Sequence, residues 1–305
     1  QLILDDDKSF IEHLHLLVPT EAAKAGDFVF SGTLGYFSYE YGVKQHQLSC
    51  QNKDLHDLPQ AWFGIYNWAV ISDHHLKTST LVYRNISQSL LSIEEIKNLW
   101  LSHYKMSKNN FCLKKKFISN ISFAEYQNDF SKIKQHIHNG DTYQVNYSHC
   151  FSAPFEGDSF DAYMILRQKN PSEFAVFLRL KQGDILSFSP ELLVRGDQKY
   201  IQTKPIKGTA ARVFDVEQDS ITKQDLHKCP KNRAENLMIV DLLRNDLSKI
   251  AKISSVKVEA LFDVEILPSV FHLISTVSAQ LDKENNYFDV INAVFPGGSI
   301  TGAPK

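Results

Sequence analysis

A single lysine in the middle of the chain has the setting of a nucleophile. Within the segment Thr203–Ala210, Lys207 stands between Pro205 and Gly208, directly after residues of strand character. Proline fixes its own φ and lacks a backbone donor, whereas glycine permits a close backbone approach or a positive φ. A lysine held between two such residues points in a defined direction, and once removed from water it attacks as the neutral amine. Spacing alone also allows a solvated lysine at the end of a strand.

An acid and a histidine are further candidates. Glu191 follows Ser189-Pro190 and precedes an apolar run with strand character. Burial there is expected to raise the pKa of the Glu191 carboxyl, so that it holds a proton near neutral pH. His272 lies in the otherwise apolar segment Pro268–Val277. Residue types alone also allow an ordinary strand-end carboxylate and a histidine whose hydrogen bonds are satisfied within the core.

A second acid belongs to the segment Asn232–Leu247, which reads as a helix. Glu235 shares one face of that helix with three apolar residues, Met238, Ile239 and Leu242. A carboxylate on an apolar face needs a partner, and a hard cation such as Mg²⁺ is one solution. The alternative is an acid of the first turn that complements the helix dipole or pairs with Arg233. The residues themselves leave both readings open.

The segment Phe295–Lys305, hereafter the glycine loop, has the composition of an anion site. Its three glycines, Gly297, Gly298 and Gly302, are expected to leave backbone N–H groups free. Pro304 is a good first residue for a following helix. Gly297 and Gly302 have the spacing of a nucleotide-binding P-loop, but Ala303-Pro304 stands where that motif requires Lys and Ser or Thr. The loop is therefore a candidate anion site, but not a nucleotide-binding P-loop.

Apolar periodicity and turn residues predict the elements that position these groups. Ser122 and Glu125 form a capping box at the start of an amphipathic helix, which we expect to pack one face on a core and to end at Asn139-Gly140. Two strands that pair with each other are expected over 62–66 and 68–74. The same reasoning predicts helices over 93–104 and 160–169, and strands over 141–147, 174–180, 185–188, 192–195 and 200–206.

The bulk composition excludes several classes of protein. The 305 residues contain 43% hydrophobic and 22% charged residues, with a formal net charge of −2. This balance is typical of a soluble globular protein and offers no basic surface for nucleic acid or anionic lipid. No apolar run is long enough to span a bilayer. The four cysteines are far apart, which is typical of reduced thiols. We therefore expect a cytoplasmic protein that binds neither nucleic acid nor membrane.

Several of these segments resemble motifs of the chorismate-utilising enzymes. The resemblance is carried by Gly35–Glu40, Gly140–Asn146, Ser189–Glu191, Pro205–Thr209, Arg233–Asp246, Pro268–Ser275 and Gly297–Lys305. Lys207 stands where anthranilate synthases of this family typically have alanine. Pro-Ile-Lys-Gly-Thr instead resembles component I of the aminodeoxychorismate synthases. The chain is therefore similar to the branch of the family that serves folate and para-aminobenzoate biosynthesis.

The resemblance implies an α+β fold of two stacked, mainly antiparallel sheets with helices on the outside. It also implies a division into residues 1–116, an incomplete N-terminal half with its linker, and residues 117–305, the chorismate-binding domain. Relatives continue for roughly a hundred residues beyond this point, and they also extend upstream. We therefore expect the chain to be truncated at both ends, with a second metal ligand outside it.

The resemblance also implies roles for individual residues. Lys207 would add to C2 of chorismate, Glu191 would protonate the departing C4 hydroxyl, His272 would lie beside the ring, and Glu235 would bind Mg²⁺. Ammonia from a glutamine amidotransferase subunit would then add at C4. Substrate contacts are implied for Gly208, Thr209, Gly297, Gly298, Ser299, Thr301 and Gly302. An aromatic-amino-acid pocket of the family includes Glu173, Phe174 and Ala175, although relatives often have proline in place of Glu173.

Two other functions stay open at this point. The first is an anthranilate synthase component I or an isochorismate-forming relative, against which Lys207 argues. The second is of another class, a truncated and non-catalytic relative that binds chorismate or a partner subunit.

Overall fold

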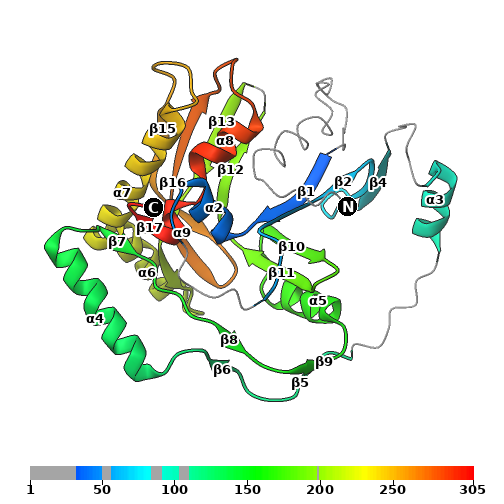
Figure 1. The fold of residues 1–305 in the computed structure, drawn as a ribbon, viewed down its shortest axis with the longest axis horizontal. Helices are drawn as coiled ribbons and strands as arrows, with labels where there is room; N and C mark the ends of the chain where they lie inside the picture. Colours follow the sequence, from blue (N-terminus) through cyan, green and yellow to red (C-terminus); the bar gives the residue numbers. More distant parts are fainter. Residues whose placement is uncertain (1–31, 50–55, 84–90, 103–109, 198) are drawn as a thin grey trace. The chain divides into compact units, whose positions relative to one another are not determined.

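The computed structural model describes residues 32–49, 56–83, 91–102, 110–197 and 199–305 (Figure 1). The chain divides into two compact units between Lys108 and Asn109, with Lys181–Gly183 assigned to the first. The linker expected before residue 116 lies partly outside the described residues. Within the described ranges, no helix combines the length and the apolar character needed to cross a membrane.

Among its described residues, the first unit contains two antiparallel strand pairs and two short helices. These elements are β1 (Gly32–Phe37), α2 (Tyr39–Gln45), β2 (Ala61–Tyr66), β3 (Trp68–Asp73), β4 (Thr78–Tyr83) and α3 (Ile93–Leu101). Strands β2 and β3 form where the sequence predicts them, but the pairing predicted between them is wrong. Strand β2 instead pairs with β1, and β3 pairs with β4 across the short turn that follows it.

A five-stranded antiparallel sheet organises the second unit. Its strands are β12 (Leu192–Gly196), β13 (Tyr200–Lys204), β14 (Ile206–Ala211), β15 (Lys257–Ile266) and β16 (Val270–Gln280). β13 and β14 pair with successive parts of β16, and β15 also pairs with β16. Pro205 stands between β13 and β14, and its carbonyl accepts a hydrogen bond from Ser275 N at 3.3 Å. The strand predicted over 200–206 therefore continues past the proline along the same partner.

Three helices pack against this sheet: α6 (Val216–Lys228), α7 (Pro230–Ser248) and α8 (Tyr287–Val294) (Figure 1). Pro230 occupies the first turn of α7, where its missing N–H is not needed. The main core joins the sheet to α7 and α8. Its buried members are Ile201, Val240, Leu247, Ile250, Val277, Ala279, Leu281, Val290 and Val294. A second cluster joins Leu226 of α6 to Phe271 and Leu273 of β16.

Helix α4 (Phe123–Asn139) forms as predicted, with the reciprocal capping box of Ser122 and Glu125. It ends at Gly140, whose φ of 82° is the left-handed conformation that glycine tolerates. The predicted packing of one face on a core is wrong for the described residues, because no residue of α4 is buried and Phe123 is 73% exposed. The strand predicted over 141–147 is shorter, with β7 at Gln144–Val145.

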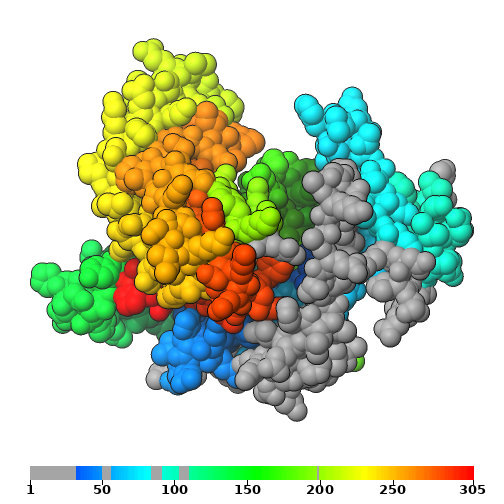
Figure 2. All heavy atoms as spheres, turned by 90° about the horizontal axis from the view of Figure 1, so that it is seen from above, coloured from blue at the N-terminus to red at the C-terminus, as the bar shows by residue number. Residues whose placement is uncertain are grey.

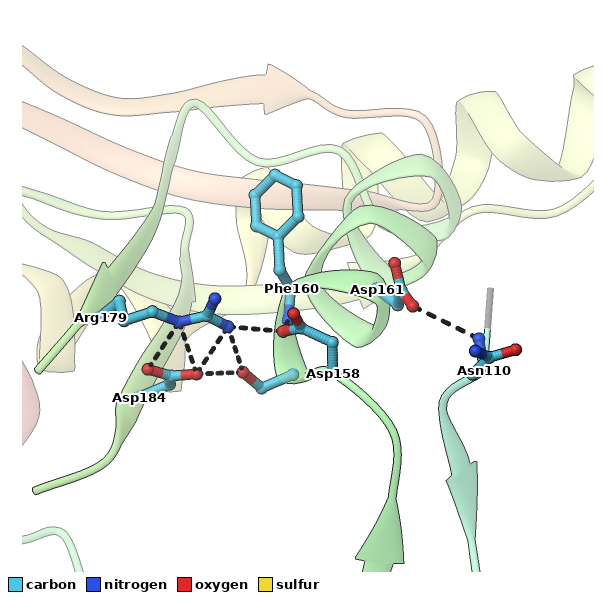
Figure 3. A network of polar contacts seen from close by, with 7 residues as sticks. Asn110, Asp158, Phe160, Asp161, Arg179 and Asp184 are labelled. Carbon is cyan, nitrogen blue, oxygen red and sulfur yellow. Dashed lines mark hydrogen bonds and ion pairs between the residues drawn. The ribbon is translucent and has the colours of Figure 1, made fainter. Parts of the chain in front are cut away.

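Helix α5 (Ser159–Lys169) contacts the hairpin of β10 (Phe174–Arg179) and β11 (Asp184–Ser189) through the ring of Tyr163, which packs on Phe177 and Phe188, and through one arginine. Figure 3 shows Arg179 between Asp184 of β11 and Asp158, the residue that caps α5. Its Nη2 lies 3.1 Å from Asp184 Oδ2. Arg179 lowers the pKa of the Asp158 carboxyl by hydrogen bonding. These ion pairs connect the cap of α5 to the hairpin from which the chain passes through Ser189 to Glu191.

Short strand pairs complete the described fold: β5 (Cys112–Leu113) with β9 (Phe155–Glu156), β6 (Ile118–Ser119) with β8 (Phe151–Ser152), and β7 with β17 (Gly302–Ala303). All strand pairs in the described ranges are antiparallel, with helices packed beside them. The predicted α+β class is therefore confirmed.

Candidate active site

Lys207 occupies a β-bulge in β14. Ile206 lies opposite Ile274 and Thr209 lies opposite His272, so β14 has one more residue than β16 between these pairs. Gly208 has a φ of 103°, which side chains with a Cβ rarely adopt. A bulge re-aims the side chains at the extra position, and here that position contains the lysine. Gly208 therefore adopts a positive φ, as predicted for a glycine at this position.

The Lys207 amine is removed from solvent. The residue is 9% exposed, and its Nζ donates a hydrogen bond to the carbonyl oxygen of Ser299 at 2.6 Å. Burial lowers the pKa of the Lys207 amine, and the charges of Glu191 and Glu235 partly oppose that shift. The alternative of a solvated lysine at a strand end is therefore wrong. Compared with a lysine in water, this environment shifts the equilibrium towards the neutral, nucleophilic amine.

Glu191 is tied to the residue before the lysine. Its Oε1 accepts a hydrogen bond from Ile206 N at 2.9 Å. Its own N–H donates to Ser189 Oγ at 3.2 Å, which fixes the turn between β11 and β12. This hydrogen bond thus holds the Glu191 carboxylate beside the residue that precedes the lysine.

His272 lies on β16 directly opposite Thr209. Its neighbours Phe271 and Leu273 point into the core beneath α6, so strand alternation directs His272 to the other face. The residue is 7% exposed, and burial lowers the pKa of its imidazole, although the charges of Glu265 and Glu191 oppose the shift. Within the described residues its Nδ1 has no hydrogen-bond partner. A buried polar atom left in this state marks a position that a ligand can satisfy.

Helix α7 carries Glu235, and its neighbour fixes the helix to the sheet. Asn236 is fully buried, its Nδ2 donates to Leu273 O at 3.3 Å, and its Oδ1 accepts from Ser275 Oγ at 2.6 Å. Glu235 itself is half-buried, and its Oε1 lies 3.8 Å from the Nζ of Lys231. These contacts set the depth at which the Glu235 carboxylate lies beside the sheet.

The alternatives considered for Glu235 are wrong on two counts. Because α7 begins at Pro230, Glu235 lies beyond the first turn and gains little from the helix dipole. Arg233 is not its partner, since that guanidinium lies over the ring of Phe262 at 4.4 Å. The ion pair between Lys231 and Glu235 is weak, because the Lys231 side chain is 82% exposed.

The donor set for a cation is small. No group of three or more histidine, cysteine or acidic side chains in the described ranges could hold a metal ion. Mg²⁺, however, is commonly held by one or two carboxylates together with water and oxygen atoms of the substrate. Glu235 fits as one such ligand, because its half-buried carboxylate is close enough for its charge to act on Lys207. Magnesium binding stays a prediction.

The glycine loop contains a four-residue helix, α9 (Gly298–Thr301), followed by β17. Gly298 and Gly302 have packing reasons to be glycine. A Cβ at Gly298 would lie 2.2 Å from Leu242 Cδ2, and one at Gly302 would lie 2.3 Å from Gln144 O. The N–H group of Gly302, which was predicted to be free, donates to Gly298 O, and the N–H groups of Ile300 and Thr301 donate to Gly297 O. Substrate binding by the predicted loop residues stays a prediction.

A buried ion pair that sequence reasoning missed anchors the glycine loop. Lys305 Nζ lies 2.7 Å from Asp246 Oδ2, and the two side chains are 12% and 2% exposed. Lys305 also donates to Val294 O at 2.9 Å, at the end of α8. The available signal was the position of Asp246, which follows Ile239 by seven residues and Leu243 by three, and so lies on the buried face of α7.

The structure thus brings together Lys207, Glu191, His272 and the Ser299 carbonyl, with Glu235 near enough to influence the amine. The residues of the predicted aromatic-amino-acid pocket lie on and before β10. Glu173 is exposed, and Phe174 pairs with Ser189, two residues before Glu191. Ligand binding by that segment stays a prediction.

Known proteins are similar to this chain in sequence and in fold. The profile described as chorismate binding enzyme matches residues 3–305. Aminodeoxychorismate synthase component 1 of Escherichia coli is 42% identical over 276 residues, which is 90% of this chain and 59% of that protein. The protein of the same name from Salmonella typhimurium is 39% identical over 305 residues, 99% of this chain and 65% of that protein.

A solved structure agrees with these matches. Anthranilate synthase component I from Streptococcus pneumoniae superposes with a TM-score of 0.85 at 28% identity, covering all of this chain and 69% of that one. The chain spans less than two thirds of the length of the two aminodeoxychorismate synthase relatives. The match of the family profile over nearly the whole chain, together with the shared fold, shows that the chain belongs to the chorismate binding enzymes.

Proposed function

We propose that the protein containing this chain aminates chorismate at C4 and so forms 4-amino-4-deoxychorismate. The observation that carries the proposal is the buried Lys207 amine, whose pKa is lowered by burial and which lies beside the anchored carboxylate of Glu191. Relatives with 42% and 39% identity carry the name aminodeoxychorismate synthase component 1. The product lies on the route to para-aminobenzoate and folate.

In the first step, Lys207 Nζ forms a bond to C2 of chorismate. The ring double bonds shift, and the bond between C4 and its hydroxyl oxygen breaks. Glu191 donates a proton to that oxygen, so the hydroxyl leaves as water. The amine loses a proton as it bonds, and the covalent adduct on Lys207 contains all atoms of chorismate except that hydroxyl. His272, neutral because burial lowers its pKa, offers its unpartnered Nδ1 to the ring substituents.

In the second step, ammonia forms a bond to C4, and the bond between C2 and Lys207 breaks. The lysine recovers its proton and the ring regains its double-bond arrangement. The net change replaces the C4 hydroxyl by an amino group and releases water. Ammonia would come from a glutamine amidotransferase subunit, which the designation component 1 of the relatives suggests.

The negative charges of the substrate require partners. Glu235 would hold Mg²⁺ with water and a substrate carboxylate, and the cation would supply charge neutralisation at that carboxylate. The backbone around the bulge, at Gly208 and Thr209, and the glycine loop would contact the remaining oxygen atoms. The loop residues proposed for this contact are Gly297, Gly298, Ser299, Thr301 and Gly302.

Intact-protein mass spectrometry tests the covalent step. The polypeptide with its natural continuation is mixed with chorismate and Mg²⁺ without ammonia or glutamine, and an adduct on the Lys207 peptide is expected. Lys207→Ala is expected to abolish the adduct, whereas Lys204→Ala, at the end of the preceding strand β13, serves as the matched control and is expected to retain it. Normal turnover by Lys207→Ala without any adduct contradicts the proposal.

Identification of the product separates this proposal from the related activities. Anthranilate or isochorismate in place of 4-amino-4-deoxychorismate would assign the chain to another branch of the family. Binding of chorismate without any turnover, in the presence of ammonia, would support the non-catalytic alternative.

A further inference from the structure

The segment before β8 runs along the glycine loop and holds it. Thr142 Oγ1 and Tyr143 N both donate to Ala303 O, at 2.9 and 2.8 Å. Asn146 N donates to Thr301 O at 3.1 Å. In Figure 1, β7, β17 and α9 lie together, and Figure 2 shows the red last residues of the chain beside the green segment that contains α4. The loop that contacts Lys207 is thus held by residues more than a hundred positions earlier.

Asn146 holds the carbonyl oxygen that Lys207 uses. Its Nδ2 donates to Ser299 O at 3.0 Å and also to Ile300 O. An amide nitrogen has two hydrogen atoms, so both bonds can be made at once. With the N–H bond to Thr301, Asn146 satisfies three successive carbonyls at the end of α9, where helical carbonyls otherwise lack partners.

The Ser299 carbonyl therefore has two donors, Asn146 Nδ2 at 3.0 Å and Lys207 Nζ at 2.6 Å. A carbonyl oxygen has two lone pairs and can accept both. A neutral amine that donates a proton to a fixed acceptor has its own lone pair directed away from that acceptor. The location of the Ser299 oxygen thus decides in which direction Lys207 can attack.

We propose that Asn146 is a positioning residue for Lys207, acting through the shared carbonyl of Ser299. The amide saturates one lone pair of this oxygen and fixes its place, so that the oxygen orients the lysine amine without binding its charged form strongly. This inference rests on the proposed function only in that the Lys207 amine is taken to be the nucleophile. The hydrogen bonds that join Asn146, Ser299 and Lys207 are present in the protein without chorismate.

Other groups also act on the amine. The carboxylates of Glu191, before β12, and Glu235, on α7, both favour its charged form, whereas burial disfavours it. The carbonyl groups at the end of α9 add negative partial charge on the side of the glycine loop. The amide of Asn146 is the neutral donor that offsets this partial charge at Ser299. Replacing it by a carboxylate would reverse that contribution.

The test is the pH dependence of trace acetylation of Lys207 by acetic anhydride, without chorismate, measured on its peptide by mass spectrometry. Asn146→Asp is nearly isosteric and places a negative charge beside the Ser299 oxygen. In this variant the midpoint pH of Lys207 acetylation is expected to rise by at least one unit. At a pH well below both midpoints, labelling of Lys207 would then fall at least tenfold. Asn146→Ala, which frees the oxygen without adding charge, is expected to give a smaller rise in the same direction.

Thr142→Val is the matched control, because it removes a bond to the same loop at Ala303 without touching the Ser299 oxygen. Its midpoint is expected to equal that of the unaltered protein. Equal midpoints for Asn146→Asp and the unaltered protein overturn the proposal, and so does an equal shift in Thr142→Val, which would indicate general loosening of the loop. If both Asn146 variants fail to fold, the residue supports the fold rather than the amine, and the proposal also fails.

The two proposals fail separately. If no chorismate adduct forms but the Asn146 variants still shift the acetylation midpoint, the proposed function is wrong and the positioning role of Asn146 is supported. A normal adduct with unchanged acetylation in Asn146→Asp removes the positioning role alone.

Discussion

The ion pair between Asp246 and Lys305 provides the sharpest prediction about stability. Both side chains are almost fully buried, at 2% and 12% exposed, and the charged atoms lie 2.7 Å apart. Burial lowers the pKa of the Lys305 amine, and Asp246 opposes that shift through its hydrogen bond and its charge. Removing one partner of a buried pair leaves the other charge without compensation, which costs about 3–5 kcal/mol. We expect Asp246→Asn to lower the free energy of unfolding by about 3 kcal/mol, since Lys305 retains the Val294 carbonyl.

Denaturant unfolding of the second unit measures this cost, and Asp241→Asn is the matched control. Asp241 lies on the same helix and pairs with Arg244 at 2.9 Å, but both side chains are more than half exposed. An exposed pair of this kind contributes about 0–1 kcal/mol. Lys305→Met and the double variant complete a mutant cycle, in which a coupling of more than about 1 kcal/mol is expected. Equal costs for Asp246→Asn and Asp241→Asn would refute the reasoning.

The loss of stability in Asp246→Asn should also depend on pH, and the direction follows from the number of protons that the folded and unfolded chains bind. In Asp246→Asn, the pKa of Lys305 in the folded state falls further below its value in the unfolded chain. Between those two values the unfolded chain binds more protons, so the stability of the variant rises with pH. The difference in the free energy of unfolding between the variant and the unaltered protein should therefore become smaller as the pH rises through the pKa of Lys305 in the folded state. A gap that widens with pH contradicts the assigned cause.

The remaining predictions concern the bulge. Because burial lowers the pKa of Lys207 in the folded state, the charged amine destabilises the protein at pH 7. Lys207→Met should therefore raise the free energy of unfolding at pH 7 by about 1.4 kcal/mol for each pKa unit of the shift. Thermal unfolding should show that this increase becomes smaller as the pH approaches about 10, where the amine is neutral in both states. A loss of stability at pH 7 would contradict it. Gly208→Ala should cost about 1–3 kcal/mol because of its φ of 103°. Adding Asn232→Ala, which removes Asn232 Cγ and Nδ2 at 3.1 and 3.2 Å from the new Cβ and keeps only the Asn232 Cβ, should not restore stability, and full recovery would assign the cost to those contacts instead.

Local signals in the sequence predicted the elements well where a short stretch of chain determines its own conformation. The capping box at Ser122 and the glycine at 140 delimit α4 as observed, and the apolar segment around His272 is β16. Partner choice was less predictable, because β2 and β3 have the same alternating pattern whichever neighbour they pair with. The exposure of α4 was likewise invisible, since an amphipathic pattern records a preference for burial and not the presence of a surface to receive it.

For the candidate site, the sequence by itself determined the chemical groups: one lysine between a proline and a glycine, one acid before an apolar strand, another acid on an apolar helix face, a histidine in an apolar strand and a glycine-rich loop. Only the tertiary structure decided that the lysine lies in a bulge, that its amine is buried, and that Asn146 and Lys207 share the carbonyl of Ser299. The physical reason is that backbone propensity acts over a few residues. Burial, by contrast, and with it the pKa of an amine, depends on segments that meet across more than ninety positions of chain.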